Sequence, residues 1–105
     1  MKLIIVDDEI AALNNFLGKI VDNTAVEYTM FNSDPLLAVE YVRKNKADAA
    51  FLDVRMDAVN GVDLAEKLLA ECPGIKIVFI SGYEQDEASI KDRLGDALLG
   101  FCYKP

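Results

Sequence analysis

A small set of acidic, hydroxyl and basic residues follows directly after short apolar runs in this 105-residue sequence. The apolar runs end in Asp7-Asp8, Asp53, Ser81-Gly82 and Lys104. Carboxylates that lie close together repel each other unless a cation compensates their charge. Oxygen ligands with open positions suit Mg²⁺, which keeps several waters and often bridges to a substrate phosphate. If the fold gathers these residues, they favour magnesium-dependent chemistry on a phosphate.

The residue types that are missing narrow the chemistry further. The sequence contains no histidine, which excludes Ser-His-Asp catalysis, histidine-liganded zinc and a role as phosphohistidine donor. Cys72 and Cys102 form no CxxC motif, so we expect two buried or half-buried free thiols. A net charge of −7 argues against direct nucleic-acid binding, because the phosphates would repel it. The apolar runs are too short to span a membrane or to form a secretory signal, so we expect a cytoplasmic protein.

Apolar runs of strand length alternate with segments of helical period along the whole chain. Strands are predicted over residues 3–6, 26–31, 49–52, 75–80 and 98–103, and helices over about 9–21, 35–46, 62–72 and 86–94. Five strands with four helices between them predict an α/β fold, a flavodoxin-like, doubly wound, five-stranded parallel sheet in the order 2-1-3-4-5. No linker or low-complexity segment interrupts the pattern, so residues 1–105 are expected to form one domain.

The expected sheet brings the polar residues to one edge. In doubly wound sheets, ligands bind beyond the carboxyl ends of the strands, where the strand order reverses. Here that point lies between the first strand, which ends in Asp7-Asp8, and the third strand, which ends in Asp53. Taken singly, the aspartates have ordinary interpretations, as a helix cap and as a loop residue. Their joint position at one sheet edge favours a site.

The chain resembles the receiver domain of two-component response regulators over nearly its whole length. The matching segments are 7–9 (DDE) after an apolar strand, 53–61 (DVRMDAVNG), 81–82 (SG) after an apolar strand, and 101–105 (FCYKP). The resemblance implies that Asp53 accepts a phosphoryl group from the phosphohistidine of a sensor histidine kinase. The chain would then be a phosphoprotein that catalyses only its own phosphorylation and dephosphorylation, not an enzyme with a separate substrate.

The resemblance implies a magnesium site around Asp53. Asp8 and Asp53 would bind Mg²⁺ directly, Asp7 would act mainly through water, and the backbone carbonyl of Arg55 would complete the protein ligands. Asp53 needs no general base because its carboxylate is already ionised, which agrees with the absence of histidine.

The resemblance also assigns roles to residues at the later strand ends. Ser81 would donate a hydrogen bond to one phosphoryl oxygen, and Lys104 would pair with another. Gly82 would leave room for the phosphoryl group to enter. Phe101 holds the position of the family's switch aromatic, which would fill space vacated when Ser81 moves; an ordinary sheet aromatic is an equally good interpretation.

The carboxyl-terminal end departs from the family pattern. Family domains continue past Lys104-Pro105 into a fifth helix, which has no counterpart here. We therefore expect the N-terminal part of a longer regulator, whose output domain, DNA-binding in a transcription regulator, lies outside this chain. Without that helix, the side chains of Val78, Ile80, Leu99 and Phe101 would form an uncovered apolar patch, which favours a homodimer or lowers stability.

Three other interpretations remain open. A degenerate receiver that acts only as a binding module is compatible with Asp57, which stands where many family members have proline. A magnesium-dependent phosphohydrolase of the haloacid dehalogenase type would use Asp7 as nucleophile and Glu9 as acid, but it needs a further acidic pair and a cap domain. A flavin binder is disfavoured because the three acids after the first strand would repel the flavin phosphate.

Overall fold

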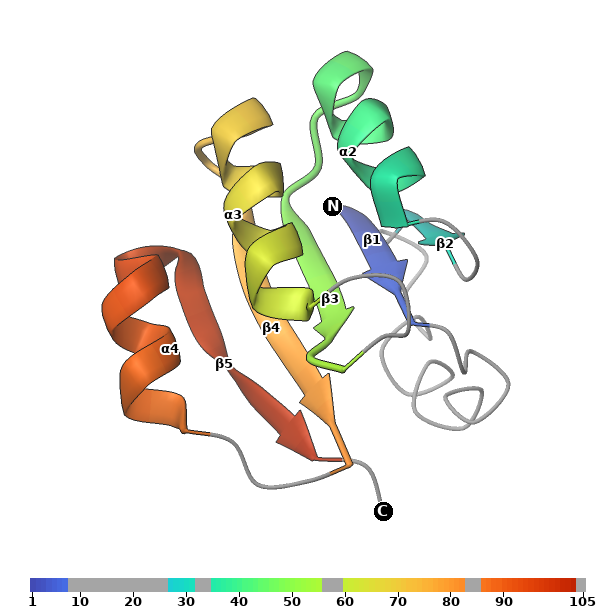
Figure 1. Ribbon diagram of the computed structural model, residues 1–105. Helices are drawn as coiled ribbons and strands as arrows, with labels where there is room; N and C mark the ends of the chain where they lie inside the picture. Colours follow the sequence, from blue (N-terminus) through green and yellow to red (C-terminus); the bar gives the residue numbers. More distant parts are fainter. Residues whose placement is uncertain (8–26, 32–34, 56–59, 83–85, 104–105) are drawn as a thin grey trace.

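The computed structural model describes residues 1–7, 27–31, 35–55, 60–82 and 86–103. The described residues form a five-stranded sheet, three α-helices and a short 3₁₀-helix (Figure 1). The strands are β1 (Lys2–Val6), β2 (Glu27–Phe31), β3 (Ala49–Asp53), β4 (Lys76–Ser81) and β5 (Leu98–Tyr103), and the helical elements are α2 (Pro35–Lys44), α3 (Gly61–Glu71), α4 (Glu87–Leu94) and η2 (Gly95–Ala97). The helix predicted over residues 9–21 lies outside the described residues.

The sheet is parallel throughout and has the order β2-β1-β3-β4-β5. The arrowheads of β1, β3, β4 and β5 in Figure 1 accordingly point toward one edge of the sheet. The strand order reverses around β1, because β2 lies on one side of it and β3 on the other. The predicted fold class and strand order are confirmed, and the reversal places the ends of β1 and β3 next to each other.

The main apolar core lies between the sheet and the three helices. Alternate residues of β1, Ile4 and Val6, face this core, whereas Ile5 belongs to a second cluster with Ile80 on the other face. Both faces of β1 are therefore buried, which explains why its apolar run is continuous rather than alternating. In the described part of the chain, no helix is both long enough and apolar enough to cross a bilayer.

The inward face of helix α2 agrees with the sequence pattern at two of three positions. The spacing of the apolar residues predicts that Leu36, Val39 and Val42 face inward. Val42 is buried and Val39 is half-buried against the core, but Leu36 is 54% exposed, and Pro35 and Ala38 are the other buried residues. The helix begins at Pro35, whose fixed φ suits the first helical position, and its inward stripe follows from that residue at spacings of three and four.

Ion pairs link the three helices to one another. Arg43 of α2 contacts Glu71 of α3 at 3.0 Å, and Arg93 of α4 contacts both Asp63, at 2.9 Å, and Glu66 of α3. The hydrogen bond from Arg43 lowers the pKa of Glu71. Hydrogen bonds to Asp63 and Glu66 raise the pKa of Arg93. These surface ion pairs therefore add contacts between helices that are already neighbours across the sheet face.

The pairing of β4 with β5 contains an irregularity that the sequence pattern did not reveal. Ile77 lies opposite Leu98, but the next residue, Val78, lies opposite Gly100. Leu99 is thus an extra residue on β5, and its side chain is 63% exposed. One extra residue in a strand reverses the faces of all the residues that follow.

The extra residue at Leu99 changes the neighbours of Phe101. Phe101 lies opposite Phe79 and packs against the helix-side core, whereas strict alternation would have put it opposite Ile80. Ile80 is itself 2% exposed. The predicted uncovered apolar patch of Val78, Ile80, Leu99 and Phe101 is therefore wrong for Ile80, which is buried, and for Phe101, which packs against the helix-side core.

Both cysteines are free thiols, as the sequence predicted. Cys72 is buried and its Sγ lies 3.7 Å from the carbonyl oxygen of Ala47, and Cys102 is half-buried on β5.

Candidate functional site

Two carboxylates lie at the carboxyl ends of neighbouring strands. Val6 of β1 is paired with Leu52 of β3, so Asp7 and Asp53 are the next residues along these two strands. Asp7 is fully buried and Asp53 is 6% exposed. The Asp7 backbone N–H donates to the Phe31 carbonyl at 3.2 Å, which ties the end of β1 to β2. The structure therefore brings together one carboxylate from each side of the expected crevice; Asp8 lies outside the described residues.

A tight backbone turn surrounds the Asp53 side chain. The Arg55 N–H donates to Asp53 Oδ1 at 3.1 Å. The preceding N–H, that of Val54, donates to the Ile80 carbonyl at 3.2 Å, which extends the β3–β4 pairing beyond the strand. Arg55 also forms an isolated antiparallel bridge with Asn60, and its side chain is exposed. The chain thus holds a backbone donor beside the carboxylate.

Helix α3 begins directly against the backbone that carries Asp53. A Cβ on Gly61 would lie 2.1 Å from the Asp53 carbonyl oxygen, far closer than atoms can approach. The Gly61 N–H donates to the Val54 carbonyl at 2.8 Å, and the Asn60 side chain caps the helix by accepting from the Val62 N–H at 2.7 Å. Gly61 therefore positions Asp53, a role that the sequence analysis did not assign. The sequence does contain a signal for this role, because this glycine stands at the start of an apolar helical stripe shortly after Asp53.

Ser81 and Gly82 continue the same edge on β4. Asp53 pairs with Ile80, so Ser81 lies one residue beyond this pair, and it is 2% exposed. Gly82 is exposed, and a Cβ there would meet nothing within 4 Å. Lys104 lies outside the described residues, so the structure brings together Asp7, Asp53 and Ser81.

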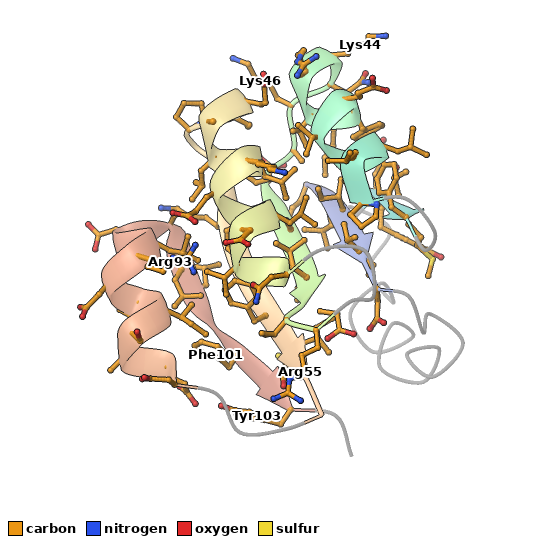
Figure 2. All side chains as sticks on the ribbon, in the orientation of Figure 1. Lys44, Lys46, Arg55, Arg93, Phe101 and Tyr103 are labelled. Carbon is orange, nitrogen blue, oxygen red and sulfur yellow. The ribbon has the colours of Figure 1, made fainter. Side chains whose placement is uncertain are left out.

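A column of three aromatic rings runs from Phe79 of β4 along the end of β5. The rings of Phe79 and Phe101 are stacked with centroids 5.6 Å apart, and those of Phe101 and Tyr103 with centroids 6.4 Å apart. Figure 2 shows Phe101 and Tyr103 following each other toward the carboxyl end of the strand. The Tyr103 hydroxyl donates to the carboxylate of Glu87 on α4. Phe101 was predicted from the sequence as a site residue and Tyr103 was not, although the spacing of two between them puts both on one face of the strand.

The donor set at this edge suits a hard cation. Two nearly buried carboxylates on adjacent strands carry negative charge that burial disfavours unless it is compensated. Oxygen donors without nitrogen or sulfur match Mg²⁺. Within the described residues there is no group of three or more histidine, cysteine or acidic side chains that could hold a metal. A magnesium site would therefore draw on Asp7 and Asp53 and on groups beyond the described ranges.

Comparisons with known proteins agree with this architecture. Residues 3–105 match the family model of the response regulator receiver domain. The transcriptional regulatory protein YpdB of Escherichia coli K12 is 31% identical over 85 residues, which are 81% of this chain and 35% of that protein. A protein-glutamate methylesterase/protein-glutamine glutaminase of Xanthomonas euvesicatoria is 26% identical over 101 residues, 96% of this chain and 29% of that protein. The chain thus spans about a third of the length of these relatives.

A solved structure shows the same fold. The response regulator TrrA of Thermotoga maritima, determined in complex with Mg²⁺ and BeF, superposes with a TM-score of 0.76 at 17% identity. The match covers 99% of this chain and 86% of that one. With the parallel sheet in the order 2-1-3-4-5 and with the family match over residues 3–105, the chain belongs to the response regulator receiver domain family.

Proposed function

We propose that this chain is a phosphoacceptor domain in which Asp53 receives a phosphoryl group from the phosphohistidine of a sensor histidine kinase. The observation that carries the proposal is the position of Asp53 and Asp7, which directly follow the paired residues Leu52 and Val6 at the point where the strand order reverses. Both side chains are nearly or fully buried there. Membership of the receiver family supports the same function.

The transfer is a displacement at phosphorus. A carboxylate oxygen of Asp53 forms a bond to phosphorus while the bond from phosphorus to the histidine nitrogen breaks, and the electron pair stays on the imidazole. Asp53 attacks as an anion, so no base has to remove a proton from it. Phosphoryl transfer passes through a loose transition state, so positioning and neutralisation of charge provide most of the rate.

Mg²⁺ is the cofactor that we infer for this reaction. It would be held directly by the side chains of Asp8 and Asp53 and by the backbone carbonyl of Arg55, and mainly through water by Asp7. When bound, it neutralises charge on the phosphoryl oxygens and on the clustered carboxylates. The structure of TrrA with Mg²⁺ and BeF supports this assignment by analogy within the family.

The residues at the ends of β4 and β5 complete the proposed site. Ser81 donates its hydroxyl to a phosphoryl oxygen, and Lys104 pairs with another. Gly82 leaves the entrance open, which agrees with the free space around its Cα. Phe101 acts as the switch aromatic and responds to movement of Ser81.

The output of the switch lies in other chains or segments. We propose that residues 1–105 are the N-terminal receiver part of a longer cytoplasmic regulator, because the chain spans about a third of its relatives. One relative is named a transcriptional regulator, so transcription regulation by a DNA-binding output domain is one function that we infer. The receiver itself acts on no separate substrate and binds neither nucleic acid nor membrane; its partners are the kinase, the output domain and a second receiver in a homodimer.

Incubation with acetyl phosphate and Mg²⁺, followed by intact mass spectrometry, tests the proposal. We expect wild type to gain one phosphoryl group and Asp53→Asn to gain none. Asp96→Asn, an exposed aspartate in η2, is the matched control and should be modified like wild type. Chelation of Mg²⁺ with EDTA should prevent the reaction.

Three other outcomes contradict the proposal in different ways. Steady release of phosphate without a modified protein would indicate a phosphohydrolase. Modification that survives Asp53→Asn but not Asp7→Asn would assign the nucleophile to the first strand. No reaction under any condition would indicate a degenerate receiver that acts as a binding module.

A further inference from the structure

A side-chain hydrogen bond joins the end of β5 to the start of α4. The Tyr103 hydroxyl donates to the carboxylate of Glu87, which lies in the first turn of α4. A hydrogen bond to an ionised acceptor is stronger than one between neutral groups. Tyr103 therefore ties a strand that ends at the proposed site to a helix on the surface of the molecule.

The start of α4 has little apolar contact with the sheet. Its first three residues, 87–89, are exposed, and the buried residues of the helix are Ile90 and Leu94, its fourth and eighth residues. A groove of about 360 Å³ lies between α4 and β5, lined by Glu87, Ala88 and Lys91 and by residues 98–101. Across this groove, Lys91 Nζ lies 3.4 Å from the Leu98 carbonyl oxygen. The exposed start of α4 thus contacts β5 through polar groups, and such contacts can be broken and remade at lower cost than buried packing.

Tyr103 is also connected to the phosphoacceptor edge. It lies opposite Ser81 in the β4–β5 register. Its ring stacks on Phe101, which stacks in turn on the fully buried Phe79. The extra residue at Leu99 is what puts the rings of Phe101 and Tyr103 on the side of the sheet that carries α4. A displacement of Ser81 or of the ring column would therefore reach Tyr103 before it reaches the helix.

We propose that Tyr103 is a positioning residue that couples the phosphoacceptor edge to α4 through its hydrogen bond to Glu87. This inference rests on the proposed function, because it concerns the transmission of the phosphorylated state. Phe101 has no hydroxyl, so it can transmit movement only by packing. Tyr103 adds a polar connection that specifies where the first turn of α4 lies.

Coupling of this kind is reciprocal. If occupancy of the Asp53 site shifts the position of α4 through Tyr103, then weakening the Tyr103–Glu87 contact must in turn change the affinity of the Asp53 site for its ligand. A residue that contributed only to stability would change the free energy of unfolding without changing this affinity. The two roles can therefore be separated by measuring ligand binding.

Amide hydrogen exchange over residues 87–94, with and without Mg²⁺ and beryllofluoride, tests the coupling. We expect the ligand to change the exchange of α4 in wild type. Tyr103→Phe retains the ring but removes the hydroxyl, and we expect it to diminish this change and to shift the beryllofluoride affinity by about threefold or more. Tyr28→Phe makes the same chemical change at an exposed tyrosine on the opposite edge strand and should behave like wild type.

Glu87→Gln tests the same contact from the helix side and should reproduce the Tyr103→Phe result. If Tyr103→Phe does not fold, Glu87→Gln alone provides the test. The inference is overturned if Tyr103→Phe and Glu87→Gln respond to beryllofluoride as wild type does. It is also overturned if wild type binds beryllofluoride with no change in α4, an outcome that leaves the proposed function intact. Failure of wild type to bind beryllofluoride at all would reject the proposed function, and the coupling with it.

Discussion

At the level of single residues, Gly61 has the most sharply defined constraint around the site. Only glycine fits at position 61, because a Cβ there would collide with the backbone of Asp53 and Val54. The contact fixes the start of α3 against the end of β3. A residue with no side chain to take part in the chemistry thereby helps to determine where the Asp53 carboxylate lies.

Gly61→Ala should consequently destabilise the protein, because the helix or the Asp53 backbone must shift to admit the methyl group. The expected loss in the free energy of unfolding is about 1–3 kcal/mol, the usual cost of forcing an extra methyl group into a packed region. Denaturant unfolding measures it. Gly74→Ala is the control, since a Cβ at Gly74 meets nothing within 4 Å. An equal effect of the two substitutions would show that the contact with Asp53 is not the cause.

At the level of elements, charge supplements packing in holding the helices side by side. The Arg43–Glu71 pair joins α2 to α3, and Arg93 joins α4 to α3. These pairs are on the surface, where each ordinarily contributes little and is screened by salt. Their main consequence is a dependence of stability on pH.

Glu71→Gln should remove part of this pH dependence. The hydrogen bond from Arg43 lowers the pKa of Glu71 below its ordinary value of 4.5. A carboxyl group with a lowered pKa in the folded state stabilises the protein above its unfolded pKa, and this contribution is lost as the pH falls through the folded pKa. Wild type should therefore exceed Glu71→Gln in urea midpoint at neutral pH, and the difference should vanish in acid.

The control for this measurement is Glu27→Gln, which removes an exposed carboxyl group on β2. It should change the midpoint little, and by a similar amount at each pH. High salt should reduce the Glu71→Gln effect at neutral pH. A difference that persists unchanged in acid would mean that the ion pair is not its source.

At the level of the whole molecule, binding at the site should stabilise the entire fold. A ligand that binds only the native state raises the free energy of unfolding by about 2.7 kcal/mol at 100 times its dissociation constant. For a domain of this size, each kcal/mol raises the melting temperature by roughly 4–8 °C. Thermal unfolding with Mg²⁺ and beryllofluoride should show such an increase in wild type and a much smaller one in Asp53→Asn. Equal increases in both proteins would place the ligand elsewhere.

The elements were predicted well where local pattern and tertiary context agree. Continuous apolar runs gave strands within a residue or two of those observed, and β5 was predicted with its observed bounds. The inward face of α2 was predicted less well, because Leu36 is as apolar as its buried neighbours. A helical stripe shows that one face is buried, but the packing partners decide which residues lie at its centre.

The sequence by itself determined the class of fold, the strand order and the position of Asp7, Asp53 and Ser81 at the strand ends, because alternating β and α segments leave few ways to build a parallel sheet. It could not determine the extra residue at Leu99, since an apolar strand pairs equally well in two registers until both faces are packed. That register decides that Phe101 and Tyr103 face α4, which local pattern does not specify. The need for glycine at position 61 and the contact of Tyr103 with Glu87 likewise arise only when segments distant in the sequence are brought together, because both depend on the spacing of packed elements.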